Sequence, residues 1–251
     1  MSQPCIKAVL FDLGETLIHY GKVSMTRVFC QGARASYDFL RGQRQPVGPF
    51  PIYLLANAAR LRWQTIRSHW AGRDFDVLDL FQRVGERKGI SLQPQQWEHL
   101  AWLWYKGLAE ASVIDPRTSD TLETLRGLGL KLGILSNTFV PAVCLDRHLT
   151  QLGLLEFFPI RIYSYQYQFR KPNLKIFNLA AERIGERAQD ILYVGDRIEY
   201  DIRPALKVGM HVALIPAYTN TGKPVPSGTR TIEHLAELPL LVSRIQGELK
   251  S

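Results

Sequence analysis

The residues with the strongest chemical potential are polar side chains that end or follow short apolar runs. They comprise three carboxylates, a hydroxyl, an amide and an amine. These residues are Asp12, Ser136, Asn137, Lys171, Asp196 and Asp201. Carboxylates that meet at one point repel one another unless a cation is present, and hard oxygen ligands without His or Cys suit Mg²⁺. The set therefore indicates a magnesium site, provided that the fold brings its members together.

The other polar groups of the set are those that hold a phosphate. A hydroxyl, backbone N–H groups and a lysine ammonium can bind phosphate oxygens, which leaves one carboxylate free to attack phosphorus in line. Taken singly, each residue has an ordinary explanation, since an Asp after a strand often caps a helix or forms a turn. The combination, more than any one member, indicates phosphoryl transfer.

Five short apolar runs are predicted to be buried strands that position these groups. Their hydrophobicity is continuous and each is followed by turn residues. They cover residues 8–13, 131–136, 160–164, 191–195 and 211–215. Helical patterns at 122–128 (behind expected caps at Thr118 and Ser119), 142–152, 174–184 and 202–208 alternate with the later strands. This predicts an α/β fold, a Rossmann-like parallel sheet with helices on both faces, whose functional groups gather at the carboxyl ends of the strands.

The long interval between the first two predicted strands has a different residue pattern. It contains four amphipathic helical stretches and all five tryptophans, but no strand pattern. The stretches cover residues 24–40, 52–70, 77–88 and 94–111. We predict an α/β core domain of residues 1–16 and 118–251 and an all-helical cap domain of residues 17–117, with the tryptophans in the core of the cap.

Composition sets outer limits on the function. The 251 residues are 46% hydrophobic with a net charge of +8, which is typical of a soluble globular protein and excludes a disordered chain or a collagen. Neither a membrane-spanning run of about 20 apolar residues nor a signal peptide is recognisable. We therefore expect a cytoplasmic protein with no membrane partner. The three cysteines lack zinc-site spacing and are expected to be buried thiols.

Positive charge is concentrated in one part of the predicted cap. Between Arg27 and Arg73 there are eight arginines and one acidic residue, a net charge of +7. Such a segment can be a solvated helical face or can attract an anionic substrate. No nucleic-acid recognition motif accompanies it, so we expect no nucleic-acid partner. A steering role predicts that kcat/KM falls with salt and when Arg60, Arg62 or Arg67 is neutralised.

Four segments in order resemble the motifs of the haloacid dehalogenase-like (HAD) hydrolase superfamily. They are AVLFDLGETL, ILSNT, RKPNLKIF and YVGDRIEYDIRPALKVG, and they begin at residues 8, 134, 170 and 193. The predicted helical insert occupies the place where many members carry a helical cap. The resemblance implies a HAD core with a cap inserted after the first motif, and a small phosphorylated metabolite as substrate.

The resemblance also implies a role for each site residue. Asp12 would be the nucleophile that forms an aspartyl-phosphate, and Lys171 would bind phosphate and restrain the charge of Asp12. Ser136 and the backbone amide of Asn137 would complete the phosphate site. The Mg²⁺ ligands would be Asp12, the carbonyl of Gly14, Asp196 and, directly or through water, Asp201.

One position departs from the phosphatase pattern of the family. Phosphatases usually carry a second Asp two residues after the nucleophile as the general acid, and here that residue is Gly14. General acid or base assistance contributes about 10² to 10⁴ in rate. Three explanations are open. Glu15 or His19 could supply the proton, or the substrate could have a good leaving group that needs little protonation. Alternatively, the site could be degenerate.

Two alternatives to a phosphohydrolase remain. A 2-haloacid dehalogenase of the same fold expels halide without a proton, which fits Gly14, but such enzymes work without metal and typically lack the Gly-Asp that this chain has at residues 195 and 196. The other alternative is a phosphate-binding or interaction protein with little turnover. The sequence indicates neither the substrate nor the oligomeric state.

Overall fold

A parallel sheet forms the centre of the protein, of which the computed structural model describes residues 5–248. Within that range the sheet has six strands in the order β3-β2-β1-β4-β5-β6. They are β1 (Ala8–Phe11), β2 (Lys131–Ser136), β3 (Ile160–Tyr163), β4 (Ile191–Gly195), β5 (His211–Leu214) and β6 (Thr229–Thr231). The first five confirm the predicted strands. The edge strand β6 was not predicted, because its three residues, TRT, carry no hydrophobic pattern.

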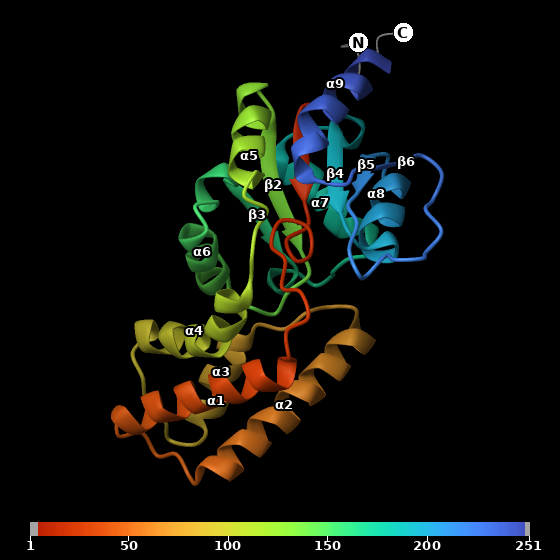
Figure 1. Ribbon diagram of the computed structural model, residues 1–251. Helices are drawn as coiled ribbons and strands as arrows, with labels where there is room; N and C mark the ends of the chain where they lie inside the picture. Colours follow the sequence, from red (N-terminus) through yellow and green to blue (C-terminus); the bar gives the residue numbers. More distant parts are fainter. Residues whose placement is uncertain (1–4, 249–251) are drawn as a thin grey trace.

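Helices cover both faces of the sheet, as predicted (Figure 1). Val9 and Phe11 of β1 pack in one apolar cluster with α5 (Thr118–Gly127), α6 (Ala142–Gln151) and α9 (Leu238–Glu248). The alternate residues Ala8 and Leu10 pack on the other side with α7 (Leu174–Ile184) and α8 (Arg203–Lys207). Burial on both faces explains why the strands read as continuous apolar runs.

Four helices lie together beyond the carboxyl ends of the strands (Figure 1). They are α1 (Met25–Gly42), α2 (Phe50–Ala71), α3 (Val77–Glu86) and α4 (Pro94–Ala111). These agree with the four predicted helical stretches, and no strand occurs between residues 25 and 111 of the described chain. Whether they form a domain bounded at residues 17 and 117 stays a prediction, and the outer ends of the predicted core domain, residues 1–4 and 249–251, lie outside the described residues.

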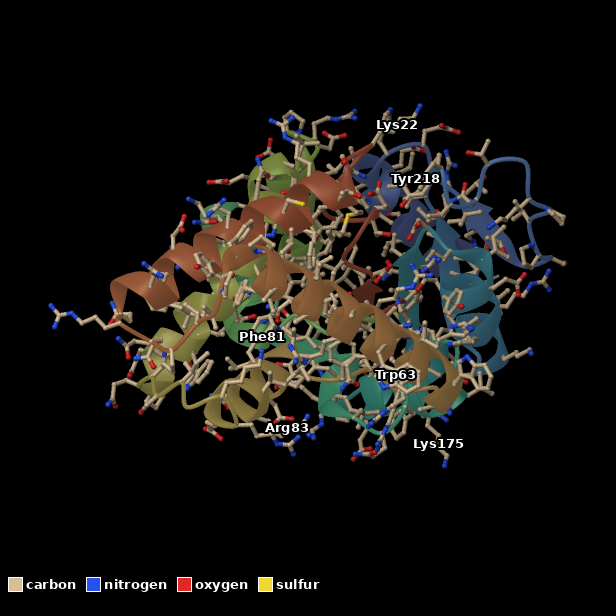
Figure 2. The ribbon with its side chains drawn as sticks, turned by 90° about the horizontal axis from the view of Figure 1, so that it is seen from below. Lys22, Trp63, Phe81, Arg83, Lys175 and Tyr218 are labelled. Carbon is tan, nitrogen blue, oxygen red and sulfur yellow. The ribbon has the colours of Figure 1, made fainter. Side chains whose placement is uncertain are left out.

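The aromatic residues of this helical group are only partly buried. Trp97 and Trp102 of α4 are buried, as expected. The expectation is wrong for Trp63 and Trp70, which are 63% and 86% exposed because they lie on the outer face of α2. Viewed from below, α2 crosses the molecule with Trp63 in its second half (Figure 2). The expectation of buried thiols is also wrong for Cys30, which is exposed on α1, whereas Cys144 is buried.

One local prediction on a helix start, the caps at Thr118 and Ser119, is wrong. Helix α5 begins at Thr118 without a side-chain cap, because Asp115 forms the preceding turn by accepting the N–H of Arg117 at 2.9 Å. The helix predicted over 202–208 is observed as the short α8, and a π-helical turn (Ile198–Ile202) precedes it. In that turn the carbonyl of Arg197 accepts the N–H of Asp201 at 2.7 Å and, as the π-helical bond, the N–H of Ile202 at 3.4 Å. Across the described residues, no helix is long and apolar enough to span a bilayer.

Candidate active site

A cavity of about 570 Å³ lies at the carboxyl edge of the sheet, between the strands and the helices of residues 25–111. Six of the seven predicted site residues line it, namely Asp12, Gly14, Ser136, Asn137, Lys171 and Asp196. The seventh, Asp201, is fully buried beside them. Helix residues Thr65 and Ser68 of α2 close the other side, and the exposed Tyr218 lines the cavity from the loop after β5 (Figure 2). The structure therefore brings the predicted set together.

The parallel register of three strands explains this convergence. Phe11 pairs with Ile134 of β2 and with Val194 of β4, so the residues that follow these positions emerge at one level. The backbone N–H of Asp12 donates to the carbonyl of Val194 at 2.9 Å and so continues the ladder one residue beyond β1. Asp12 is thereby fixed next to the segment that carries Asp196.

Lys171 is the central cation of the site. Its Nζ lies 2.8 Å from Oδ1 of Asp12 and 2.6 Å from Oδ1 of Asp201, and it donates to the hydroxyl of Tyr193 at 3.0 Å. The lysine is only 2% exposed. The two carboxylates raise its pKa against the opposing effect of burial, so the ammonium stays charged.

The side chain of Asn137 holds Lys171 in place through a reciprocal pair of hydrogen bonds. Its Oδ1 accepts the Lys171 N–H and its Nδ2 donates to the Lys171 carbonyl, both at 2.8 Å. Sequence reasoning assigned Asn137 only a backbone contact to phosphate. The structure adds a positioning contact between the second and third motifs.

Asp196 offers a carboxylate oxygen that has no partner. Its Oδ2 accepts the hydroxyl of Thr219, whereas Oδ1 is buried and makes no hydrogen bond within the described structure. One oxygen each from Asp12, Asp196 and Asp201 lies within 4.8 Å of the others. An orphaned buried carboxylate oxygen beside two further carboxylates fits a hard divalent cation with oxygen ligands.

The carboxylates of the site are costly to ionise in the absence of a cation. Burial, together with the charges of Asp201 and Asp196, raises the pKa of Asp12 to about 7, even though Lys171 opposes the shift. Burial likewise raises the pKa of Asp196, while the hydrogen bond from Thr219 opposes it. Both shifts favour binding of a positive ion, which would stabilise the charged forms.

Asp201 is more tightly engaged than the other two carboxylates. Its Oδ1 accepts from Lys171 and from the Tyr193 hydroxyl at 3.0 Å, and its Oδ2 accepts the backbone N–H of Arg197 at 2.9 Å. Gly195 makes this position possible, since a Cβ built there would lie 2.7 Å from the Asp201 Cβ and Cγ. The role of Asp201 as a metal ligand remains a prediction, and its observed contacts are to Lys171, Tyr193 and the backbone of Arg197.

The surroundings of Gly14 bear on the missing general acid. A Cβ built on Gly14 would lie 3.4 Å from Cε2 of Tyr20, so the phenol ring occupies the space next to this position. Glu15 lines the cavity, but its Oε1 accepts the backbone N–H of Tyr20 at 3.1 Å. His19 does not line the cavity, and its backbone pairs with that of Val113. The structure thus places Glu15, and not His19, among the cavity residues.

Tyr20 begins a buried chain of hydrogen bonds whose direction can be deduced. Ser112 Oγ donates its one hydrogen to the carbonyl of Ala109 at 2.7 Å, so it must accept from Nε2 of His148 at 2.9 Å. The pKa of His148 is lowered to about 4 by burial, so the ring is neutral and Nδ1 is an acceptor. Tyr105 therefore donates to Nδ1 at 2.9 Å.

The chain of hydrogen bonds continues from Tyr105 to Tyr20 at the cavity. Because the Tyr105 hydrogen is used, Tyr20 donates to the Tyr105 oxygen at 3.2 Å. The Tyr20 hydroxyl is thus committed to Tyr105 and is not free to protonate a leaving group. Burial also raises the pKa of Tyr20, which disfavours loss of its proton.

Two groups of the site, Tyr193 and Asp74, were not predicted from the sequence. Tyr193 stands in the otherwise aliphatic strand ILYVG, and a buried phenol needs a polar partner, which was a usable signal. Asp74, just after α2, accepts from Arg170 Nη1 at 2.5 Å and from Ser68 Oγ at 3.0 Å. This contact ties the end of α2 to the residue before Lys171, and it joins segments 96 positions apart with no local signal.

Comparison with known proteins gives a consistent result. A family model described as haloacid dehalogenase-like hydrolase matches residues 6–209. The chain is 40% identical over 210 residues to the glyceraldehyde 3-phosphate phosphatase of Methanopyrus kandleri, covering 82% of each protein. It is 37% identical over 95 residues to the enzyme of the same name from Methanocaldococcus jannaschii, which is 38% of this chain and 41% of that protein.

A solved structure has the same fold. The 2-haloacid dehalogenase from Pseudomonas syringae superimposes with a TM-score of 0.61 at 23% identity, covering 96% of this chain and 99% of that one. At this identity the likeness extends to the fold and not to the choice between attack at carbon and attack at phosphorus.

Proposed function

Because the chain belongs to the haloacid dehalogenase-like hydrolases, we propose that it is a Mg²⁺-dependent phosphohydrolase that acts on a small phosphorylated metabolite. The observation that carries this proposal is the buried, unpartnered Oδ1 of Asp196 beside Asp12 and Lys171 in one cavity. A dehalogenase that works without metal has no use for such an oxygen. The names of the relatives, which are phosphatases, support the same choice.

Asp12 and Lys171 would perform the first chemical step. The free oxygen of Asp12 attacks phosphorus in line, and the bond from phosphorus to the leaving oxygen breaks, which gives an aspartyl-phosphate. Lys171, at 2.8 Å from Asp12, favours the ionised form that is needed for attack, and a bound cation would favour it further. Water then hydrolyses the aspartyl-phosphate, which releases phosphate and restores the Asp12 carboxylate.

The other cavity residues would bind and orient the phosphate. Ser136 lines the cavity and offers a hydroxyl, and the Asn137 backbone lies next to it. The groups placed to hold Mg²⁺ are the carboxylates of Asp12 and Asp196, with the Gly14 carbonyl and Asp201 as further predicted ligands. When bound, the cation would neutralise charge on the transferring phosphoryl group.

The experiment that tests the proposal is release of phosphate from acetyl phosphate, with and without Mg²⁺. We expect turnover that EDTA abolishes and that Asp12→Asn reduces to background. Asp120→Asn, an exposed substitution of the same chemistry in α5, is the matched control and should keep full activity. Full activity of Asp12→Asn would overturn the assignment of the nucleophile.

Two other outcomes would replace the proposal. Release of halide from 2-chloropropionate without metal would show a dehalogenase. If no turnover of either kind is detected, thermal stabilisation by Mg²⁺ plus inorganic phosphate would indicate a phosphate-binding protein.

A further inference from the structure

A second hollow adjoins the cavity and has a different chemical character. Its volume is about 130 Å³, and it lies among α1, α2, α3, α4 and the segment after β2. The side chains that line it are apolar except for Asn57, Arg60 and the hydroxyl of Tyr105. Its walls include Val28, Leu80, Phe81, Ala101, Trp104 and Leu108. We refer to this hollow as the apolar chamber.

The apolar chamber shares a wall with the phosphate cavity. Met25, Tyr105, Leu108, Phe139 and Val140 line both. The chamber therefore adjoins the cavity that contains Asp12. The chamber is thus placed to hold the part of the substrate that leaves after the phosphoryl group is transferred.

The volume and lining of the chamber select an aromatic ring. An apolar cavity of about 150 Å³ in a protein interior stays dry and binds benzene, so a chamber of about 130 Å³ accommodates one ring. A polar organic group such as a short chain of hydroxyls would lose its water without gaining hydrogen bonds from these walls. Trp104 and Phe81 offer ring faces for additional aromatic contacts.

Arg60 adds a charge requirement at the chamber. Its Nη1 donates to Oδ1 of Asn57 at 3.3 Å, and its guanidinium forms no ion pair with any carboxylate of residues 5–248. Because α2 contains no acidic residue, nothing on its own helix neutralises it. A carboxylate on the ring would provide the missing partner in a planar geometry that guanidinium favours.

The absence of a carboxylate at residue 14 points independently to an aryl leaving group. The Tyr20 hydroxyl is committed to Tyr105 and is not poised to give a proton, and Oε1 of Glu15 accepts the backbone N–H of Tyr20. An aryl oxygen is a much weaker base than an alkyl oxygen and can leave with the electron pair of the broken bond to phosphorus. It then takes a proton from water, so the step balances without a general acid.

We propose that the substrate is a phosphate monoester of a hydroxyaryl carboxylic acid, with its ring in the apolar chamber and its carboxylate at Arg60. The proposal rests on the proposed phosphohydrolase function and specifies its substrate class. It departs from the names of the relatives, whose stated substrate, glyceraldehyde 3-phosphate, has a small polar organic group.

The test compares four compounds with purified protein and Mg²⁺: 4-carboxyphenyl phosphate, phenyl phosphate, glyceraldehyde 3-phosphate and acetyl phosphate. We expect kcat/KM to be highest for the carboxyphenyl ester, about tenfold lower for the phenyl ester, in line with one charge-assisted contact, and lower again for glyceraldehyde 3-phosphate. Equal or higher kcat/KM for glyceraldehyde 3-phosphate would overturn the proposal.

Variants locate the effect in the chamber. Arg60→Gln should lower kcat/KM about tenfold more for the carboxyphenyl ester than for the phenyl ester. Arg183→Gln, an exposed arginine on α7, is the control and should change neither. Val28→Phe should reduce turnover of both aryl esters but leave acetyl phosphate unaffected, because acetyl phosphate has no ring to place. An unchanged ratio of the two aryl esters in Arg60→Gln would exclude the carboxylate contact.

Acetyl phosphate separates this inference from the proposed function. Loss of all turnover, including that of acetyl phosphate, would contradict the phosphohydrolase itself and the inference with it. Turnover of acetyl phosphate without preference for aryl esters would contradict only the assignment of the chamber.

Discussion

The ammonium of Lys171 lies 2.6 Å from Oδ1 of Asp201, a carboxylate that is buried behind the cavity and does not line it. The same ammonium lies 2.8 Å from Asp12. Asp201 is therefore placed to hold the lysine at the correct position and charge, while Lys171 faces the proposed nucleophile.

Asp201→Asn should lower kcat by about tenfold to a hundredfold, since it removes one of the two charges that fix the Lys171 ammonium. Tyr193→Phe, which removes only the hydroxyl at 3.0 Å from Lys171, should cost less than Asp201→Asn. Steady-state kinetics at saturating Mg²⁺ measures both. Equal activity of Asp201→Asn and the wild type would show that Asp12 alone is enough to position the lysine.

In EDTA at pH 8, Asp12→Asn should be more stable than the wild type. The pKa of Asp12 is raised to about 7 in the folded protein, above its ordinary value of 3.8, so the folded state holds this proton more tightly than the unfolded state. The contribution of Asp12 to stability is therefore complete below about pH 4 and lost as pH rises through about 7. Urea unfolding of both proteins should show a difference in stability that shrinks as pH falls from 8 to 5. A constant difference would contradict this pKa.

Gly14→Asp should raise activity selectively on substrates with poor leaving groups. The Cβ fits beside Tyr20 at 3.4 Å, and the new carboxyl supplies a general acid worth up to about 10² to 10⁴ in rate. We expect a gain in kcat/KM for glyceraldehyde 3-phosphate and little gain for phenyl phosphate, because an aryl oxygen leaves without help. A loss for both substrates would mean that the native site uses this space for something else.

His148→Leu should destabilise the protein by about 1 to 3 kcal/mol near neutral pH, because the buried hydroxyls of Tyr105 and Ser112 lose their partner. The pKa of His148 is lowered to about 4, so the unfolded state takes up the proton first as pH falls below about 6.5. The stabilising effect of His148 is therefore present above this range and lost toward pH 4. Chemical denaturation of wild type and variant across this range should show the two stabilities converging. Tyr105→Phe, which keeps the histidine, should not abolish the pH dependence.

The arginines of α2 should accelerate capture of an anionic substrate. Arg62 and Arg67 are exposed and no acidic residue lies on their helix, so their field is screened only by salt over about 8 to 10 Å. We expect kcat/KM to fall with increasing NaCl while kcat stays constant, and the dependence to weaken in Arg62→Gln/Arg67→Gln. No dependence on salt would identify these arginines as a solvated face without a role in capture.

Much of the fold could be predicted because its signals are local. The strands Lys131–Ser136 and Ile191–Gly195 are uninterrupted apolar runs that end at turn residues, and α4 begins at Pro94, where proline is favoured in a first helical turn. The edge strand β6 lacked such a signal because its half-exposed residues need no apolar pattern.

The sequence was enough to predict which residues meet at the site, because a parallel sheet brings the carboxyl ends of its strands to one edge. The finer contacts were not, because they join distant segments. Tyr20, Tyr105 and His148 come from the segment after β1, from α4 and from α6, and their hydrogen bonds depend on how these elements pack. Asp74 and Arg170 meet for the same reason.

The close approach of Gly195 and Asp201 also constrains how this sequence can evolve. With a Cβ at 195 only 2.7 Å from the carboxylate-bearing carbon, any side chain there displaces Asp201, and the displaced carboxylate releases Lys171. Residues 195 and 201 are therefore sterically coupled, and through Asp201 the glycine also determines where the lysine ammonium lies.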